Sequence, residues 1–353
     1  MLFRSGAELF ADLSAAWAGG EPELLADFDV PSVNVQTILH NAGIVLTGLE
    51  PNRLRPISLN GKLRFRQNQL TLDDLNVKAG DTVVTGWFRH RRGDPAAWTF
   101  ALESDSLLLA DKAEDGSLHI TSAGVLVGLL VERLSDLPAD VTAAGSIAVE
   151  QLWVDRIQAE HVIATIRAKG KVLSIAPLSG QLYSGAGQLF IWLDRRADAP
   201  LILVRQAVGD FNLGKLLRDA DDIAGIEATG DLNFVLAMQG RTGAELLKNA
   251  RGAARVSLRN GELSAELFDR VLGHFDTELV AVISAQLPVL NVEQASTSIR
   301  IDRGVIHNPD LRLTGRGFWI EGKGSLSVSV GAVDYRIRSE EHTSELQSRA
   351  YLV

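Results

Sequence analysis

A glycine-rich segment in the middle of the chain is the first candidate for chemistry. Residues 177–194 read PLSGQLYSGAGQLFIWLD. A phosphate-binding loop holds its anion with backbone amides at the N-terminus of a following helix, often beside a lysine. Here Ser184-Gly185-Ala186-Gly187 is soon followed by LFIWL, large apolar and aromatic residues that are typical of a strand. We therefore predict a turn or bulge between two strands, not a phosphate site.

An acidic run, DADD at residues 219–222, is a candidate for calcium binding. An EF-hand loop takes oxygen ligands from its first, third and fifth positions and needs glycine at the sixth and glutamate at the twelfth. Counted from Asp219, the fifth, sixth and twelfth positions hold Ile223, Ala224 and Gly230. The pattern fails, so the sequence predicts the solvated end of a helix instead.

Histidine, cysteine and serine show no spacing that predicts a catalytic or metal site. No two histidines lie three to five residues apart, and the chain contains no cysteine. This argues against a local zinc pair, a thiolate site and a cysteine nucleophile. No G-x-S-x-G elbow of a serine hydrolase is present. We expect no catalytic residue, no metal and no cofactor, while an enzyme with a site dispersed along the chain stays an open alternative.

Composition limits the class of protein and of partner. Of the 353 residues, 46% are hydrophobic and 22% are charged, which is typical of a globular chain. A net charge of −9 without a basic stripe argues against a nucleic-acid partner. No run of about 18 apolar residues is present, so no segment is predicted to span a bilayer.

The elements that must position any site are mostly strands. Residues 61–66, 298–302, 325–330 and 333–337 alternate between apolar and polar side chains, as in antiparallel sheet with one apolar face. Glycines near residues 261, 304, 315–317 and 322–324 read as hairpin and bulge signals between strands. A loose repeat of strands with a glycine at the last turn recurs three times. We predict a mainly β fold with short helices (α+β), whose antiparallel meanders form an elongated, curved, groove-like sheet.

Short helices are expected at four places. Residues 6–18 and 211–222 have helical apolar spacing, with Leu213, Leu216 and Leu217 on one stripe of the second helix. Thr242 and Glu245 match a capping box that opens a helix running to about residue 251. Ser264 is a candidate N-cap for a helix through residue 275.

The two ends read as translated sequencing adapter. Residues 338–348, RSEEHTSELQS, and residues 1–5, MLFRS, match the two strands of a common adapter. We set aside residues 1–5 and 338–353 as artefact and read-through. The remainder divides into a first part, residues 6–145, and a β-rich second part, residues 146–337, and we expect it to be an internal piece of a longer protein.

One strand of the second part is apolar on both faces. In a strand over residues 189–193, Leu189, Ile191 and Leu193 point one way, while Phe190 and Trp192 point the other. Such a strand is typical of the centre of a packed fold. The functional alternative is that one face lines a groove open to lipid, which makes Leu189, Ile191 and Leu193 candidate lipid-facing residues.

Several motifs, taken in order, resemble the AsmA family over nearly all of residues 6–337. They are LTLDDL at 70–75, GDTVVTG at 80–86, FALESDSLLL at 100–109, PLSGQLYSG at 177–185, GRTGAELL at 240–247, NPDLRL at 308–313 and GKGSL at 322–326. The chain departs from the family at Ser184, where a second glycine is usual.

The resemblance implies a non-enzymatic bacterial envelope protein, related to TamB-type proteins, that supports outer-membrane biogenesis. Its implied activities are handling or transport of phospholipid or another acyl-chain lipid between membranes, and regulation of protein targeting to and assembly in the membrane. The implied location is the periplasm, anchored to the inner membrane by a segment outside this chain. Implied partners are lipid, the membrane and outer-membrane assembly proteins. The alternative is a β-rich periplasmic interaction scaffold that binds partners at its sheet edges without binding lipid.

Overall fold

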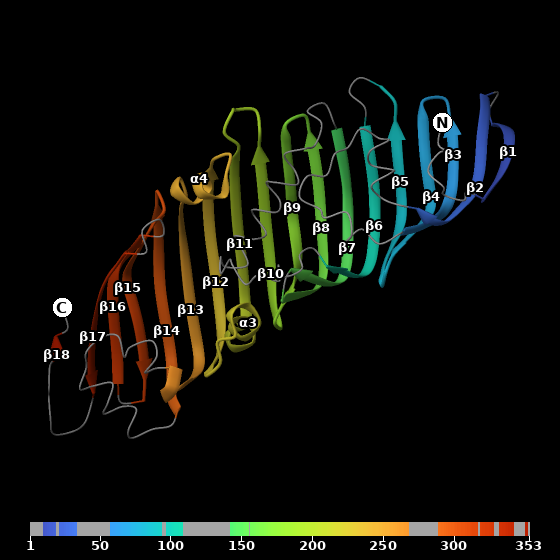
Figure 1. The fold of residues 1–353 in the computed structure, drawn as a ribbon. Coiled ribbons are helices and arrows are strands. Elements are labelled where there is room, and N and C mark those ends of the chain that lie inside the picture. The colour runs from blue at the N-terminus through green and yellow to red at the C-terminus, as the bar shows by residue number, and fades with distance from the viewer. Residues whose placement is uncertain are drawn as a thin grey trace. The chain divides into compact units, whose positions relative to one another are not determined.

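The computed structural model describes residues 10–18, 21–33, 57–93, 97–108, 142–154, 156–267, 289–316, 318–327, 332–341 and 350–351. Most of these residues are strand, which confirms the mainly β fold class (Figure 1). Two compact units share the chain: Met1–Asp155, Ala159–Leu178 and Trp192–Arg196 form the first, and Arg156–Gln158, Ser179–Ile191 and Ala197–Val353 the second. The predicted boundary between residues 145 and 146 stays a prediction.

In the first unit, each of the first five strands pairs antiparallel with the next in sequence. This arrangement needs only short hairpin connections, such as the turn after β4 where Gly80 has a φ of 62°. The strands are β1 (Phe10–Ala18), β2 (Glu21–Val33), β3 (Ile57–Arg66), β4 (Gln69–Ala79), β5 (Thr82–Arg91), β6 (Ala97–Leu108) and β7 (Thr142–Val154).

The pairing of β6 with β7 is parallel, unlike the antiparallel pairing predicted throughout. Their register runs from Ala97 opposite Thr142 to Leu108 opposite Trp153. A parallel pair needs a crossover connection of a dozen or more residues. The connection between these strands, residues 109–141, is long enough for that crossover. The sequence pattern of the strands themselves carries no sign of their relative direction.

The second unit is an antiparallel meander in which every strand from β11 to β18 pairs with the next. Its strands are β11 (Leu201–Asn212), β12 (Ile226–Gln239), β13 (Arg251–Ser264), β14 (Val289–Asp302), β15 (Val305–Gly315), β16 (Phe318–Ser327), β17 (Ala332–Glu341) and β18 (Ala350–Tyr351). The intervening strands β8 (Ile157–Lys169), β9 (Val172–Leu182) and β10 (Gly185–Asp194) divide their residues between the two units.

The core of the second unit is centred on Leu290 and Ile320, which are almost fully buried. Four partly buried apolar residues pack against this pair: Leu263, Leu313, Phe318 and Ile337. They come from β13, β15, β16 and β17, so the core fixes the register of strands that are distant in sequence.

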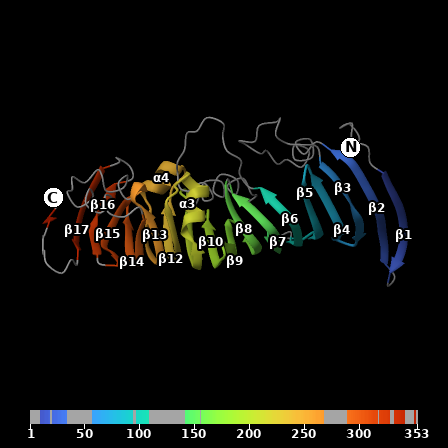
Figure 2. The ribbon, with the colours of Figure 1, turned by 90° about the horizontal axis from the view of Figure 1, so that it is seen from below.

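Two short helices belong to the second unit, and Figure 2 shows both on the same side of its sheet. Helix α3 (Leu213–Asp221) begins after Asn212, whose side chain accepts a hydrogen bond from Lys215 N. Helix α4 (Gly243–Lys248) has Thr242 as its N-cap, as predicted. Glu245, however, accepts from Arg241 N and not from Thr242 N, and α4 ends before the predicted residue 251 because Arg251 begins β13.

The predicted helix over residues 6–18 is wrong, since Phe10–Ala18 is strand β1. Leu13, Ala15 and Trp17 lie on one face of β1, opposite Ala26, Leu24 and Pro22 of β2. This cross-strand pairing overrides the helical spacing of the same residues. At the other helix predicted by its cap, Leu267 N donates to Ser264 Oγ, and the rest of that segment, residues 268–275, lies outside the described residues.

Candidate functional site: the two faces of the second unit

One face of the second unit is apolar from β11 to β17. Paired residues in an antiparallel sheet lie on the same face, and successive residues alternate between faces. The register therefore identifies a row of apolar or small residues that crosses every one of these strands: Val204, Leu236, Gly252, Ile301, Ile306, Leu326 and Val333. We call the surface that contains this row the apolar face.

The apolar face is closed at its β11 end and open at its β17 end. Ile202 on β11 is 2% exposed, and Val208 and Phe211 on the same strand are also buried. Leu326 on β16 is 37% exposed and Val333 on β17 is 64% exposed. Large apolar side chains left in water at one end of a continuous apolar surface are a candidate contact site for an apolar ligand or partner.

A polar row interrupts the apolar face in its open half. It consists of Thr297 on β14, Asn308 on β15 and Tyr335 on β17. The Tyr335 hydroxyl donates to Asn308 Oδ1 at 2.7 Å, and Asn308 Nδ2 donates to Thr297 Oγ1 and, at 3.1 Å, to the Ser298 carbonyl. We call these three side chains the polar row.

Two glycines of β16 make room for this arrangement. A Cβ atom placed on Gly322 would lie 2.8 Å from Tyr335 Oη, and one on Gly324 would lie 2.5 Å from Tyr335 Cδ2. The tyrosine ring therefore lies along β16 and reaches β15 across it. The sequence predicted these glycines between strands, and that prediction is wrong because both lie inside β16.

The environment of Tyr335 keeps its phenol protonated. Burial raises the pKa of Tyr335, and the nearby carboxylate of Asp310 raises it further. The neutral hydroxyl is the form that donates to Asn308. The polar row is thus a hydrogen-bonded element at neutral pH, without a charge on the apolar face.

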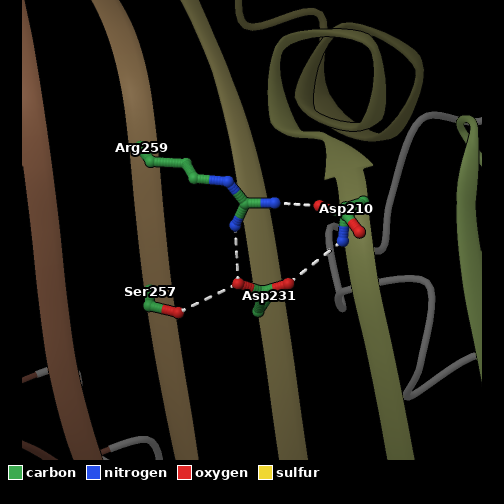
Figure 3. Close-up of polar contacts among 4 residues, drawn as sticks. All are labelled: Asp210, Asp231, Ser257 and Arg259. Atoms are coloured by element: carbon green, nitrogen blue, oxygen red, sulfur yellow. Dashed lines mark hydrogen bonds and ion pairs between the residues drawn. The ribbon is translucent and has the colours of Figure 1, made fainter.

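The opposite face carries an ion-pair cluster, drawn in Figure 3, that joins three strands. Arg259 on β13 contacts Asp210 on β11, and its Nη1 lies 2.8 Å from Asp231 Oδ2 on β12. Asp231 also accepts from Ser257 Oγ at 3.4 Å and from Asp210 N at 3.0 Å. Asp210 has a φ of 61° within the bulge of β11, so the cluster fixes a bulge in the sheet.

The glycine-rich segment at residues 184–187 begins in a turn between two strands, as predicted, and continues into β10. Tyr183 and Ser184 have φ values of 48° and 71° and connect β9 to β10 directly. Gly185 is required by close approach to β11, because a Cβ there would lie 2.5 Å from the Gly209 carbonyl oxygen. No helix follows, since Gly185–Asp194 is strand β10.

The candidate lipid-facing residues lie on β10. Ile191 is 5% exposed and Leu193 is 2% exposed, while Leu189 is half-buried. Phe190, on the other face of the strand, is more exposed than any of these three. Contact of Leu189, Ile191 and Leu193 with lipid stays a prediction.

The acidic and histidine candidates do not come together. Asp222 ends α3 in the left-handed conformation and pairs with Arg156 at 2.7 Å, which fits the predicted helix end. His161 Nδ1 lies 2.8 Å from Glu150 Oε1. Among the described residues, no three histidine, aspartate or glutamate side chains are placed to hold a metal ion. His40, His119 and His274 lie outside the described residues.

Comparison with known proteins decides the family. The profile of the AsmA family matches residues 128–311, which is more than half of the chain. The chain belongs to the AsmA family. AsmA proteins are envelope proteins linked to outer-membrane biogenesis and are generally not enzymes, so membership supports an envelope role for this chain. No curated protein and no solved structure was found to match it.

The apolar and polar rows lie on strands that the AsmA match covers only in part. The match ends at Leu311 in β15, whereas the open end of the apolar face continues through β16 and β17. NPDLRL and GKGSL are two of the motifs that resemble the family, and Asn308, Gly322 and Gly324 of these motifs all contact or approach Tyr335. Within the described residues, no helix is long and apolar enough to cross a membrane.

Proposed function

We propose that this AsmA protein binds acyl-chain lipid, phospholipid foremost, on its apolar face and thereby supports outer-membrane biogenesis without catalysing a reaction. The observation that carries the proposal is the continuous apolar row from Val204 to Val333, which becomes exposed at β16 and β17. Monomeric soluble proteins rarely leave such rows in water without a contact to make.

The energetics suit a lipid with long chains. Each methylene group removed from water contributes about 0.8 kcal/mol, so an acyl chain gains affinity in proportion to the strands it crosses. Such binding needs no nucleophile and no metal. The polar row adds hydrogen-bonding groups to the same surface, and these groups suit the ester region of a lipid.

Membership of the AsmA family supports the proposed location and motivates the further proposed partners. The proposed location is the periplasm, with attachment to the inner membrane through a segment outside this chain. Proposed partners are the membrane and outer-membrane assembly proteins. Regulation of protein targeting to the membrane is proposed as a consequence of the same envelope role.

Lipid mass spectrometry on matched variants tests the proposal. Val333→Asp places a charge on the open end of the apolar face, whereas Val235→Asp places it at a 52% exposed valine on the opposite face of the same sheet. We expect phospholipid to copurify with the parent and with Val235→Asp, and to fall at least fivefold in Val333→Asp. Equal lipid in both variants, or none above an unrelated acidic control, would overturn the proposal.

An interaction scaffold without lipid is the second candidate. The burial of Ile191 and Leu193 favours it, because at β10 the apolar side chains are ordinary core. The two candidates differ at Leu189, which is half-buried: Leu189→Asp lowers bound lipid if this strand contacts it, and only lowers stability if it does not.

A further inference from the structure

The polar face of the second unit contains a cavity of about 590 Å³ between β15, β16 and β17. Its charged lining residues are Asp310, Arg312, Glu321, Lys323, Arg336 and Arg338. With Arg338 left out as part of the adapter-like end, three of these are cations and two are carboxylates, which is a local positive excess in a chain whose net charge is −9.

The register of β16 and β17 places two of the cations directly opposite each other. Lys323 pairs with Arg336, and both side chains are exposed. Like charges opposite each other across two strands destabilise a sheet. Among the described residues, neither side chain takes part in an ion pair that would relieve this repulsion.

The neighbouring carboxylates are oriented to other groups. Asp310 accepts hydrogen bonds from Ser298 N at 2.7 Å and from Ser298 Oγ at 2.6 Å, both on β14. Glu321 lies between Arg312 and Arg338 in the register. Arg338 also lies over the Trp319 ring, with Cζ 5.4 Å from the ring centroid. The pair Lys323 and Arg336 therefore keeps its positive charge facing the cavity.

We propose that this cavity binds a phosphate group, with Lys323 and Arg336 as the cations that contact it. A tetrahedral oxyanion accepts several hydrogen bonds at once from an ammonium and a guanidinium group. Its negative charge attracts both cations and offsets the repulsion between them. The cavity is larger than a free phosphate ion, so it suits a phosphate ester. The site lies on the face opposite the apolar row, and it stands whether or not that row binds lipid.

Thermal unfolding of the full chain at constant ionic strength tests the site. The probes are sodium chloride, inorganic phosphate and glycerol 3-phosphate. In the parent we expect one or both phosphate probes to raise Tm by about 2–4 °C above chloride. Lys323→Gln and Arg336→Gln should each abolish this increment. Each variant should also have an equal or higher Tm in chloride, because it removes the like-charge contact.

A control and a vesicle assay complete the test. Arg300→Gln removes an exposed arginine of β14 that does not line the cavity, and it should retain the increment. Flotation with vesicles of phosphatidylglycerol or phosphatidylcholine distinguishes a lipid headgroup from a free phosphate ester as the source of the group. No increment in the parent, its survival in both glutamine variants, or a lower Tm of those variants in chloride would overturn the proposal.

Discussion

The two halves of the apolar face belong to one continuous antiparallel register but differ in how far their side chains are buried. On β11 and β12, the large side chains of Ile202, Val204, Phe211 and Met238 are buried. From β14 to β17, the same face carries a polar row, two glycines under a tyrosine ring and exposed aliphatic side chains. The first half is buried along β11, whereas the second half is buried only around Leu290 and Ile320 and exposes Leu326 and Val333.

Truncation of one apolar side chain in each half should give the largest difference in stability between the two halves. Phe211→Ala should lower the free energy of unfolding by about 3–5 kcal/mol, because it leaves a cavity beneath a 2% exposed ring. Val333→Ala should change it by less than about 0.5 kcal/mol. Urea unfolding monitored by circular dichroism measures both, and similar losses would mean that the open half is covered core.

Substitution of a β16 glycine by alanine tests whether the Tyr335 ring lies over that strand. Gly322→Ala should destabilise by about 1–3 kcal/mol, since its Cβ would lie 2.8 Å from Tyr335 Oη and 2.9 Å from Tyr335 Cε1. In the double variant with Tyr335→Ala, most of that loss should disappear, and a double-mutant cycle gives the coupling. Additive losses would show that the ring lies elsewhere.

The hydroxyl of Tyr335 should contribute less than its ring. Tyr335→Phe removes the 2.7 Å hydrogen bond to Asn308 and leaves that amide oxygen without its donor, so we expect a loss of about 1 kcal/mol. The same urea titration measures it. An unchanged stability would mean that water or another donor replaces the phenol, and the polar row would then be no fixed element.

The smallest effect concerns acid unfolding at the polar-face side of the open half. Hydrogen bonds from Ser298 lower the pKa of Asp310, so its carboxylate stabilises the folded state above the unfolded pKa, and this contribution is lost as pH falls through the folded pKa. Asp310→Asn should therefore be less stable than the parent at neutral pH, and the difference should shrink in acid. Asp334→Asn removes a carboxylate without a bond to Ser298, so a loss in both variants would report net charge alone.

The sequence predicted those features of the fold that depend on neighbouring residues. Period-two alternation identified the strands, and the caps Thr242 and Ser264 marked true helix starts. The turn at Ser184 was predicted because five large apolar residues after it are incompatible with a phosphate loop. Each of these features is decided within a few residues of chain.

The features that the sequence missed are decided by distant partners. Gly322 and Gly324 looked like a turn, but they lie inside β16 because Tyr335 of the next strand occupies the space above them. The segment at Phe10–Ala18 became a strand because β2 offers it an edge. The polar row joins three strands, so no local sequence pattern predicts it. The motifs NPDLRL and GKGSL nevertheless contain Asn308 of this row and the two glycines that make room for Tyr335.

Because each strand from β11 onward pairs with the next in sequence, the width of the sheet in the second unit depends on the number of strands. Each added strand lengthens the sheet by about 4.8 Å, so β11 to β17 measure about 29 Å across. Because each strand contacts chiefly its two neighbours, a duplicated hairpin can be inserted without disturbing the register of the rest. Duplication or deletion of a hairpin in the gene can therefore lengthen or shorten the sheet.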